Sequence, residues 1–359
     1  MATVEEVIEA LSHVQDPELH KDLVTLKMVK DVRVDAASVS ATIELTTPAC
    51  PLKNKIREDA AAAIQRLPGV ETVTIDFTSR VRAQQGPQAI AGVKHVIAIG
   101  SGKGGVGKST IAANLALALA ETGAKVGLLD ADIYGPSLPL MLGVQGQQPV
   151  SDGKVLFPIE AHGLAVMSIG FLLPSAEDPV IWRGPMLGGV LNQFLREVSW
   201  GELDYLLVDL PPGTGDIPLT LVQSIPLSGA VIVITPQQVA SAIGLKTLRM
   251  FQADRIEVPV LGIIENMSSF ECPHCHVKTD IFDEGGGAFL AEREGVPFLG
   301  SLPLSEGVRL GSDKGVPVVV SDPESDAAAR FRTIAGALAG RVSVAEHGRR
   351  PLPVGLPVL

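Results

Sequence analysis

The stretch that most constrains this chain is a glycine-rich loop between two apolar runs. The loop reads IGSGKGGVGKST from Ile99 to Thr110; residues 95–99 precede it, and an alanine- and leucine-rich run, 111–120, follows. A strand, a tight loop and a helix with the spacing Gly-x-x-x-x-Gly-Lys-Ser form a phosphate-binding P-loop. Glycine is needed because backbone N–H groups must turn inward around phosphate oxygens. The sequence therefore predicts a nucleotide site at this loop.

Side chains of the loop have distinct predicted roles. Lys108 is expected to reach the β- and γ-phosphates, the Ser109 hydroxyl to coordinate magnesium, and Thr110 to support the loop. The helix that follows adds a dipole that favours anions. A second lysine, Lys103, either completes the site of a partner subunit or neutralises phosphate charge locally. The remaining predicted nucleotide contacts come from the loop itself, at Gly102, Lys103, Gly104, Gly105, Val106 and Gly107.

The composition favours a globular α/β protein and disfavours several function classes. The 359 residues are 46% hydrophobic and include 37 glycines and 26 prolines, enough for a large core and two or three domains. A net charge of −11 disfavours nucleic-acid and anionic-membrane partners, because phosphate contacts need clustered lysine and arginine. No long apolar run is present, and the acidic start MATVEEVIEA differs from a signal sequence. We therefore expect a cytoplasmic protein.

The pattern of the chain changes along its length. Residues 1–80 predict a small α+β domain, 81–94 a linker, 95–345 a larger α/β domain and 346–359 a disordered tail. In the larger domain strands and helices alternate, which predicts a mostly parallel sheet covered by helices on both faces. The turn-rich residues 143–163 are expected to be an insertion in this domain.

Carboxylates follow two predicted strands of the larger domain. Strand 125–129 ends in Asp130-Ala-Asp132, and strand 205–208 ends in Asp209. Ligands of parallel sheets bind beyond the carboxyl ends of the strands, so these groups are predicted to face the nucleotide. Asp209 is expected to hold magnesium through water. Asp132 positions attacking water or a magnesium-bound water, whereas Asp130 either shares this role or caps its strand.

Three further polar residues are candidates for the nucleotide site or for a partner contact. The loop PPGTGD after Asp209 ends in Asp216 and is suited to sensing the γ-phosphate. Asn266, after strand 260–264, either reads an adenine edge or caps the next turn. Arg183, in WRGPM, either contacts a partner or the nucleotide or is a solvated surface residue.

Two of the three cysteines form a CxxC motif, Cys272-Pro-His-Cys275. Two thiolates on one tight turn suit iron–sulfur or zinc ligation, but such sites normally take four ligands. His274 and His276 are alternative zinc ligands, and the same pair from a second subunit across a two-fold axis is the most economical completion. A catalytic dithiol and an inert turn stay open as other interpretations.

The small domain holds two features of its own. Cys50 lies between prolines before a predicted helix, a setting that lowers a thiol pKa and favours thiolate; the alternative is a small buried residue at a loop–helix junction. The stretch DPEL, Asp16 to Leu19, predicts a helix stop and turn, with a functional role as the alternative.

The motifs of residues 93–338, taken in order, resemble those of the Mrp/ApbC family of iron–sulfur cluster carrier ATPases. They are GKGGVGKST, DADIYGPS, WRGPM, DLPPGTGD, ENMS and CPHC. This family belongs to the deviant Walker A class of P-loop NTPases, which also contains MinD, ParA and the nitrogenase iron protein. Residues 1–80, with DPEL and TTPACP, resemble the small SufT/MIP18-like domain commonly fused in front of such carriers.

The resemblance assigns roles to single residues. It implies that Lys103 crosses a dimer interface to the partner's nucleotide and that Asp132 is the switch I aspartate. It further implies that Asp209 and the following loop form switch II and that Asn266 contacts adenine. It leaves the role of Cys50 unsettled. The residues expected to act in catalysis are Lys103, Lys108, Asp132 and Asp209.

The implied protein is a homodimeric, slow, switch-type ATPase that carries a labile [4Fe-4S] cluster to apo-proteins. Cys272 and Cys275 of two protomers would bridge the cluster, with ATP and Mg²⁺ as cofactors and with apo iron–sulfur proteins and cluster scaffold proteins as partners. We expect the nucleotide state to couple to cluster binding or release. Two alternatives stay open: a positioning ATPase similar to MinD or ParA, and an ATPase whose cysteines hold a structural zinc.

Overall fold

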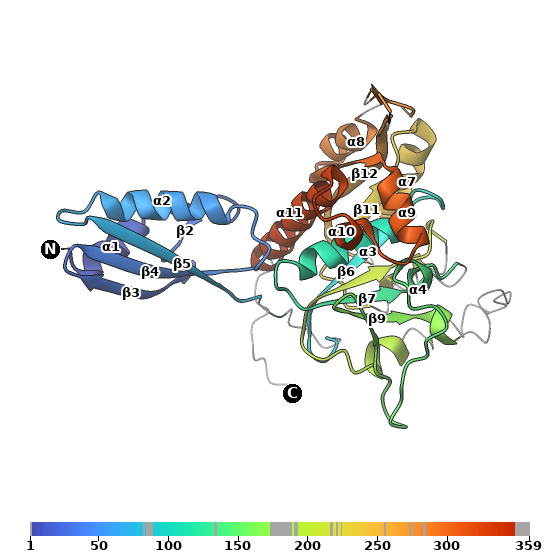
Figure 1. Ribbon diagram of the computed structural model, residues 1–359, viewed down its shortest axis with the longest axis horizontal. Helices are drawn as coiled ribbons and strands as arrows, with labels where there is room; N and C mark the ends of the chain where they lie inside the picture. The colour runs from blue at the N-terminus through green and yellow to red at the C-terminus, as the bar shows by residue number, and fades with distance from the viewer. Residues whose placement is uncertain are drawn as a thin grey trace. The chain divides into compact units, whose positions relative to one another are not determined.

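The chain forms two compact units, Met1–Arg82 with Ala339–Leu359, and Ala83–Leu338. Both are drawn in Figure 1, each described here by itself. The computed structural model describes residues 2–81, 83, 89–132, 135–172, 189, 193–215, 218–219, 222–223, 225–254, 256–272, 274–275, 277–282 and 285–348. Residues 82 and 84–88 of the predicted linker and residues 349–359 of the predicted tail lie outside these ranges.

The first unit is a three-stranded sheet with two helices. Strands β3 (Val29–Asp35) and β4 (Ser38–Leu45) pair antiparallel, and β5 (Thr72–Ser79) pairs parallel with β4. Helices α1 (Val4–Leu11) and α2 (Lys53–Gln65) contact each other and this sheet (Figure 1).

Local sequence explains both the start of the first helix and the burial of the middle strand. Thr3 and Glu6 form a capping box at the start of α1, each side chain accepting from the backbone N–H of the other. Strand β4 alternates between buried and partly exposed residues, so one face of the sheet faces the core. The short strands β1 (Gln15–Asp16) and β2 (Lys21–Asp22) form a separate hairpin around DPEL.

The second unit is built on a nine-stranded, mostly parallel sheet in the order β13-β12-β11-β6-β10-β7-β9-β8, with β14 also on β12. Among the described strands of this sheet, only two pairs are antiparallel, β8 with β9 and β12 with β13. Its strands are β6 (Val93–Ser101), β7 (Val126–Asp130), β8 (Ile159–Ala161), β9 (Leu164–Ser168), β10 (Leu203–Asp209), β11 (Gly229–Ile234), β12 (Val260–Glu271), β13 (Lys278–Thr279) and β14 (Phe298–Leu304).

The central strands are nearly continuous apolar runs because helices cover the sheet. All of β7 and β11, and nearly all of β6 and β10, are buried, as expected for parallel strands packed on both faces. Two groups of helices pack on the sheet (Figure 1): α3 with α4, α9 and α10, and α7 with α8. Their bounds are α3 (Lys108–Ala120), α4 (Leu138–Met141), α7 (Gln238–Gln252), α8 (Gly286–Glu294), α9 (Glu306–Asp313) and α10 (Val318–Ser321). The predicted α/β architecture is confirmed.

Helix α3, which follows the P-loop, is buried on all sides. Residues 111–119, all alanine, leucine, isoleucine or asparagine, are each exposed by 3% or less. The asparagine, Asn114, bridges two elements: its Nδ2 donates to the Thr110 carbonyl, and its Oδ1 accepts from the Val319 N–H of α10. The helix that presents the P-loop is therefore fixed within the core.

Two elements differ from the sequence prediction. The stretch 143–163 was expected to be an insertion of turns, but it contains β8, which extends the sheet as an antiparallel edge strand. The last helix, α11 (Asp326–Gly348), continues past residue 345, where the predicted tail begins. Strand β8 could not be recognised from the sequence, because an edge strand of this length needs only a few apolar positions and turn-forming residues surround it. Among the described residues no helix has the length and apolar character needed to cross a bilayer.

Candidate nucleotide and cysteine sites

The P-loop lies between the carboxyl end of β6 and the start of α3. Gly105 and Gly107 have φ of 80° and 81°, in the left-handed region that favours glycine. Gly102 is required for another reason, because a Cβ there would lie 2.5 Å from the Ile243 carbonyl carbon in α7. The loop thus has glycine where its backbone turns and where a helix approaches it.

A buried ion pair joins the P-loop to the end of β10. Lys108 Nζ lies 2.6 Å from Asp209 Oδ1 and 3.5 Å from Asp132 Oδ2, and its side chain is 6% exposed. Ser109 Oγ donates to Asp209 Oδ2 at 2.5 Å. Burial raises the pKa of Asp209, and the Lys108 ammonium acts against this shift. The structure therefore brings together Lys108, Ser109, Asp132 and Asp209, as the motif spacing predicts.

Asp130 is fully buried and holds the loop that leads from β7 to α4. It lies beside Asp209 in the register of β7 and β10. One carboxylate oxygen accepts from the Asp132 N–H, and the other accepts from the Leu138 N–H and from Ser168 Oγ. Burial and the Asp209 charge raise the pKa of Asp130 to about 8. These contacts match the strand-end capping interpretation and also fix the backbone of Asp132.

Lys103 contacts its own chain. Its Nζ donates to Gln237 Oε1 at 2.8 Å, and Gln237 is the residue that precedes the first turn of α7. The acceptor is an uncharged amide, and a cation at a helix N-terminus is disfavoured by the helix dipole. The Lys103 ammonium group thus has one hydrogen-bond partner within the described part of the chain.

Asn266 lies on the P-loop. Its Nδ2 donates to the Val106 carbonyl at 2.8 Å, and a methyl group at Gly107 would collide with the same nitrogen. The side chain therefore supports the loop backbone, whereas its contact with adenine stays a prediction. The neighbouring Glu265 is buried and accepts the Gly287 N–H at 2.6 Å, at the start of α8.

The CxxC pair lies at the end of the β12–β13 hairpin. The Cys272 N–H donates to the Val277 carbonyl at 3.1 Å and closes the turn. Cys272 is partly exposed and Cys275 is exposed. Hydrogen bonds from the backbone N–H groups of Cys275 and His274 lower the pKa of Cys272, which favours thiolate. Among the described residues, no three cysteine, histidine or acidic side chains gather to hold a metal, so the pair has no further ligand there.

Cys50 does not have the predicted low pKa. Burial is the largest effect and raises the pKa of the thiol to about 11, and the nearby Glu18 and Asp16 charges add to it. The Leu52 N–H acts in the opposite direction but is weaker. The interpretation as a reactive thiolate is therefore wrong, and the alternative of a small, partly buried residue at a loop–helix junction fits.

DPEL forms a turn, as predicted, and lies near Cys50. Asp16 Oδ1 accepts from the N–H groups of Glu18 and Leu19, which stabilises the turn. The sequence does not indicate that this turn and Cys50 lie close together, because strands β2, β3 and β4 separate them along the chain.

Some candidate residues cannot be placed, and some relevant residues were missed. Asp216, Arg183 and His276 lie outside the described residues. Gln237 and Ser168, which hold Lys103 and Asp130, were not predicted. The available signal for Gln237 was a polar residue in the short segment between the buried strand β11 and helix α7. Ser168 carries none, because serine at a strand end is common.

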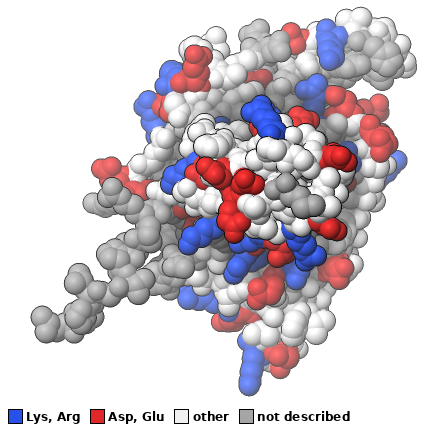
Figure 2. Space-filling view, turned by 90° about the vertical axis from the view of Figure 1, so that its left-hand side faces the viewer, with Lys and Arg blue, Asp and Glu red and all other residues white. Residues whose placement is uncertain are grey.

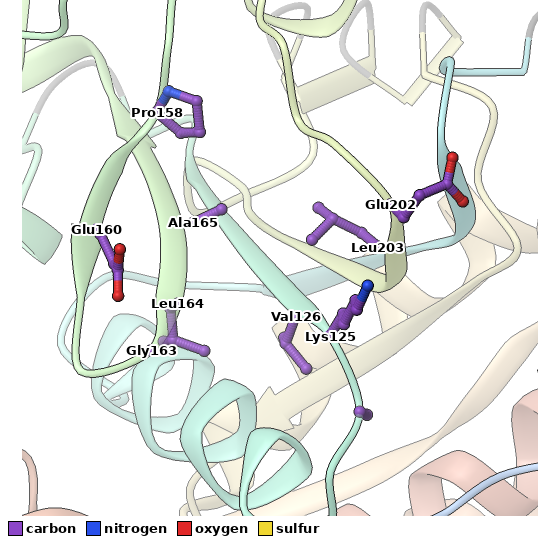
Figure 3. Close-up of a pocket in the computed structure, with 10 residues that line it drawn as sticks. Lys125, Val126, Pro158, Glu160, Gly163, Leu164, Ala165, Glu202 and Leu203 are labelled. Atoms are coloured by element: carbon purple, nitrogen blue, oxygen red, sulfur yellow. The ribbon is translucent and has the colours of Figure 1, made fainter. Parts of the chain in front are cut away.

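A surface hollow of about 360 Å³ lies where β7 and β10 begin, at the end of these strands opposite to the P-loop. Figure 3 shows an apolar floor with Val126, Leu164 and Leu203, and charged side chains of Lys125, Glu160 and Glu202 around it. The hollow is therefore separate from the P-loop. Figure 2 shows acidic and basic side chains interspersed on one face, without a continuous basic surface there.

Comparisons with known proteins cover nearly the whole chain. The profile described as NUBPL iron-transfer P-loop NTPase matches residues 92–339, and that described as iron–sulfur cluster assembly protein matches residues 4–76. The chain is 52% identical to the iron–sulfur cluster carrier protein of Synechocystis, over 96% of this chain and 99% of that protein. It is 44% identical to the Escherichia coli protein of the same name, over 94% and 91%.

Solved structures resemble the second unit. A nucleotide-binding protein from Archaeoglobus fulgidus in complex with ADP is 42% identical and has a TM-score of 0.58, covering 66% of this chain and 91% of that chain. The cell division ATPase MinD from Pyrococcus furiosus, 24% identical with a TM-score of 0.52, covers 68% and 97% and supports the fold alone.

The buried ion pair predicts a stability change in nucleotide-free protein. Lys108→Ala should lower the free energy of unfolding by about 3–5 kcal/mol, because it leaves the buried Asp209 carboxylate unpaired. Adding Asp209→Asn should restore part of this loss. Urea unfolding followed by tryptophan fluorescence measures the second unit, which contains both tryptophans, Trp182 and Trp200.

Lys94→Ala is the matched control, because its ion pair with Asp204 is more exposed and should contribute only about 0–1 kcal/mol. Equal losses for Lys94→Ala and Lys108→Ala would contradict a special role for the buried pair.

The raised pKa of Cys50 predicts slow, strongly pH-dependent alkylation. Only the thiolate reacts, so at pH 8 about one Cys50 in a thousand is reactive, and the rate should rise about tenfold per pH unit up to about pH 11. Peptide mass spectrometry after iodoacetamide treatment measures this rate, with the exposed Cys275 as internal reference. Labelling of Cys50 as fast as that of Cys275 at pH 8 would refute the assignment.

Proposed function

Because this chain belongs to the NUBPL-type iron-transfer P-loop NTPase family, together with the iron–sulfur cluster carrier proteins, we propose that it is an ATP-dependent iron–sulfur cluster carrier. It binds a labile [4Fe-4S] cluster at a dimer interface and transfers it to apo-proteins. The observation that carries this proposal is that strand β12 contacts the P-loop through Asn266 and leads directly into the exposed CxxC hairpin. Because the thiols must stay reduced, the carrier would work in the cytoplasm.

The cluster needs ligands from two chains. A [4Fe-4S] cluster takes four thiolates, and one hairpin supplies Cys272 and Cys275. Exposed apolar side chains flank the pair: Val277 is 57% and Ile281 49% exposed. A second copy that contacts this surface would both cover the apolar side chains and complete the ligand set.

The residues around the P-loop fit ATP with magnesium. Ser109 and Asp209 offer oxygen donors, the ligand type that Mg²⁺ prefers, and they already lie within hydrogen-bond distance of each other. Bound magnesium would neutralise charge on the phosphates during transfer. Lys108 would exchange its contact with Asp209 for the phosphates, and Asp132, held by Asp130, would orient the attacking water.

Lys103 would complete the site of the partner. To cross a dimer interface its ammonium group must leave Gln237 Oε1, a neutral partner in an unfavourable helix-dipole field. The phosphates of a second chain offer a stronger, charge-assisted hydrogen bond. Hydrolysis would then depend on dimerisation, which suits a slow, switch-type ATPase whose partners are scaffold proteins and apo iron–sulfur proteins.

Anaerobic reconstitution with iron and sulfide tests the carrier proposal. We expect a broad absorption band near about 400 nm and about four irons per two chains. Cys272→Ala/Cys275→Ala should abolish both, whereas Cys50→Ala, the matched cysteine control, should keep them. Transfer to an apo-protein that requires a [4Fe-4S] cluster is then measured by its recovered activity.

A colourless protein that holds zinc at the same pair would contradict the carrier proposal and favour a structural metal clamp. Iron binding that survives in Cys272→Ala/Cys275→Ala would place the cluster elsewhere.

ATP hydrolysis tests the role of Lys103. Lys103→Ala should keep nucleotide binding and lower the hydrolysis rate by about 10²–10³-fold, the cost of losing a charged group at the transferred phosphate. In the unaltered protein the rate per chain should rise with protein concentration as dimers form. Lys125→Ala, at the far edge of the sheet, is the control that should hydrolyse normally. A normal rate in Lys103→Ala would exclude the trans role.

A further inference from the structure

Strand β12 runs from the P-loop to the cysteine pair. Within the strand the Asn266 side chain holds the Val106 carbonyl, and just after its end the backbone N–H of Cys272 closes the CxxC hairpin. The two sites of the proposed carrier therefore share one short piece of backbone, Asn266 to Cys272.

The P-loop end of this piece is tightly packed. No side chain fits at Gly107, because even a methyl group would collide with Asn266 Nδ2. The end of the Met267 side chain also approaches Gly107, with Cε 3.9 Å from the position of such a methyl group. The hydrogen bond from Asn266 Nδ2 to the Val106 carbonyl, together with the approach of both side chains to Gly107, links the backbone of residues 106–107 to residues 266–267.

The middle of the piece is irregular. Asn266 pairs with Leu302 of β14 and Phe270 with Leu304, so the pairing shifts register and residues 267–269 form a bulge. Met267 has φ of 58°, a left-handed conformation that is strained for a residue with a side chain. Ser268 Oγ donates to the Leu302 carbonyl at 3.1 Å and anchors the bulge to the neighbouring strand. The bulge is the part of β12 best suited to change conformation, because its pairing with β14 is interrupted there.

The far end of the piece sets the orientation of the cysteines. Phe270 and Glu271 pair antiparallel with Thr279 and Lys278 of β13, so the hairpin follows the direction in which β12 leaves the bulge. A change in the bulge therefore reorients the turn that holds Cys272.

We infer that the bulge 267–269 is the mechanical link between the P-loop and the cysteine pair, with Met267 as its positioning residue. Nucleotide binding moves residues 106–107, the strained bulge responds, and the hairpin presents its thiols differently. This inference rests on the proposed function, because it names the element that connects the two proposed sites. It needs no contact between the nucleotide and the cysteines.

The experiment measures how fast a bimane reagent alkylates Cys272 and Cys275 in full-length, metal-free, anaerobic protein, with and without the non-hydrolysable analogue AMP-PNP. The buried thiol Cys50 is the internal reference. In the unaltered protein the nucleotide should change the rate by about fivefold, the lower end of coupling between linked sites. Met267→Gly relaxes the left-handed position and should reduce this change to less than about twofold while keeping nucleotide affinity.

Glu257→Gly is the matched control, because Glu257 is also left-handed, with φ of 49°, but precedes β12 at the end opposite to the bulge. It should keep the full nucleotide response. Loss of the response in Met267→Gly alone supports the link.

Three outcomes would overturn it: no nucleotide response in the unaltered protein, a full response in Met267→Gly, or a loss of nucleotide binding in Met267→Gly. The carrier proposal fails separately, when the unaltered protein takes up no cluster on reconstitution whatever its thiol response.

Discussion

The nucleotide site depends on a charge pair that cannot face water. Lys108 and Asp209 are almost fully buried, and each has the other as its close counter-charge. In the proposed function, phosphate binding would therefore be an exchange of partners, in which Lys108 leaves the Asp209 carboxylate for the phosphates. The affinity for nucleotide would be a difference between two strong interactions, so the strength of the internal pair would matter as much as the contacts with phosphate.

The surrounding fold keeps this pair in place. The parallel sheet brings the ends of β7 and β10 side by side, so that Asp130 and Asp209 are neighbours in register. Lys108 is the first residue of helix α3, so the burial of this helix fixes the position of the lysine. Burial, and then the like charge of Asp209, raise the pKa of Asp130. Asp130 accepts hydrogen bonds from the backbone N–H groups of Asp132 and Leu138 and from Ser168 Oγ, and the first of these holds the backbone of Asp132. The fully buried Asp130 thus positions Asp132, which is partly exposed to solvent.

Sequence reasoning succeeds where chemistry and spacing coincide along the chain. The P-loop, the carboxylates after two strands and the CxxC pair were predicted from local patterns, because each is a short motif next to an apolar run. Sequence reasoning fails where a property depends on contacts between residues that are far apart in the chain. The pKa of Cys50 follows from burial and from two carboxylates of a distant turn, and the hydrogen bond between Lys103 and Gln237 joins residues far apart in the chain. Neither has a local signature.

The unequal exposure of the two hairpin thiols has a consequence for delivery by the proposed carrier. As cluster ligands, Cys275 would be the more exposed, and Cys272, which is partly exposed, would be held by two backbone N–H groups. An incoming acceptor thiolate would meet the more exposed ligand first, so ligand exchange at each hairpin would be ordered. The cargo would pass through a state bound to donor and acceptor together, and it would not need to be released free into solution.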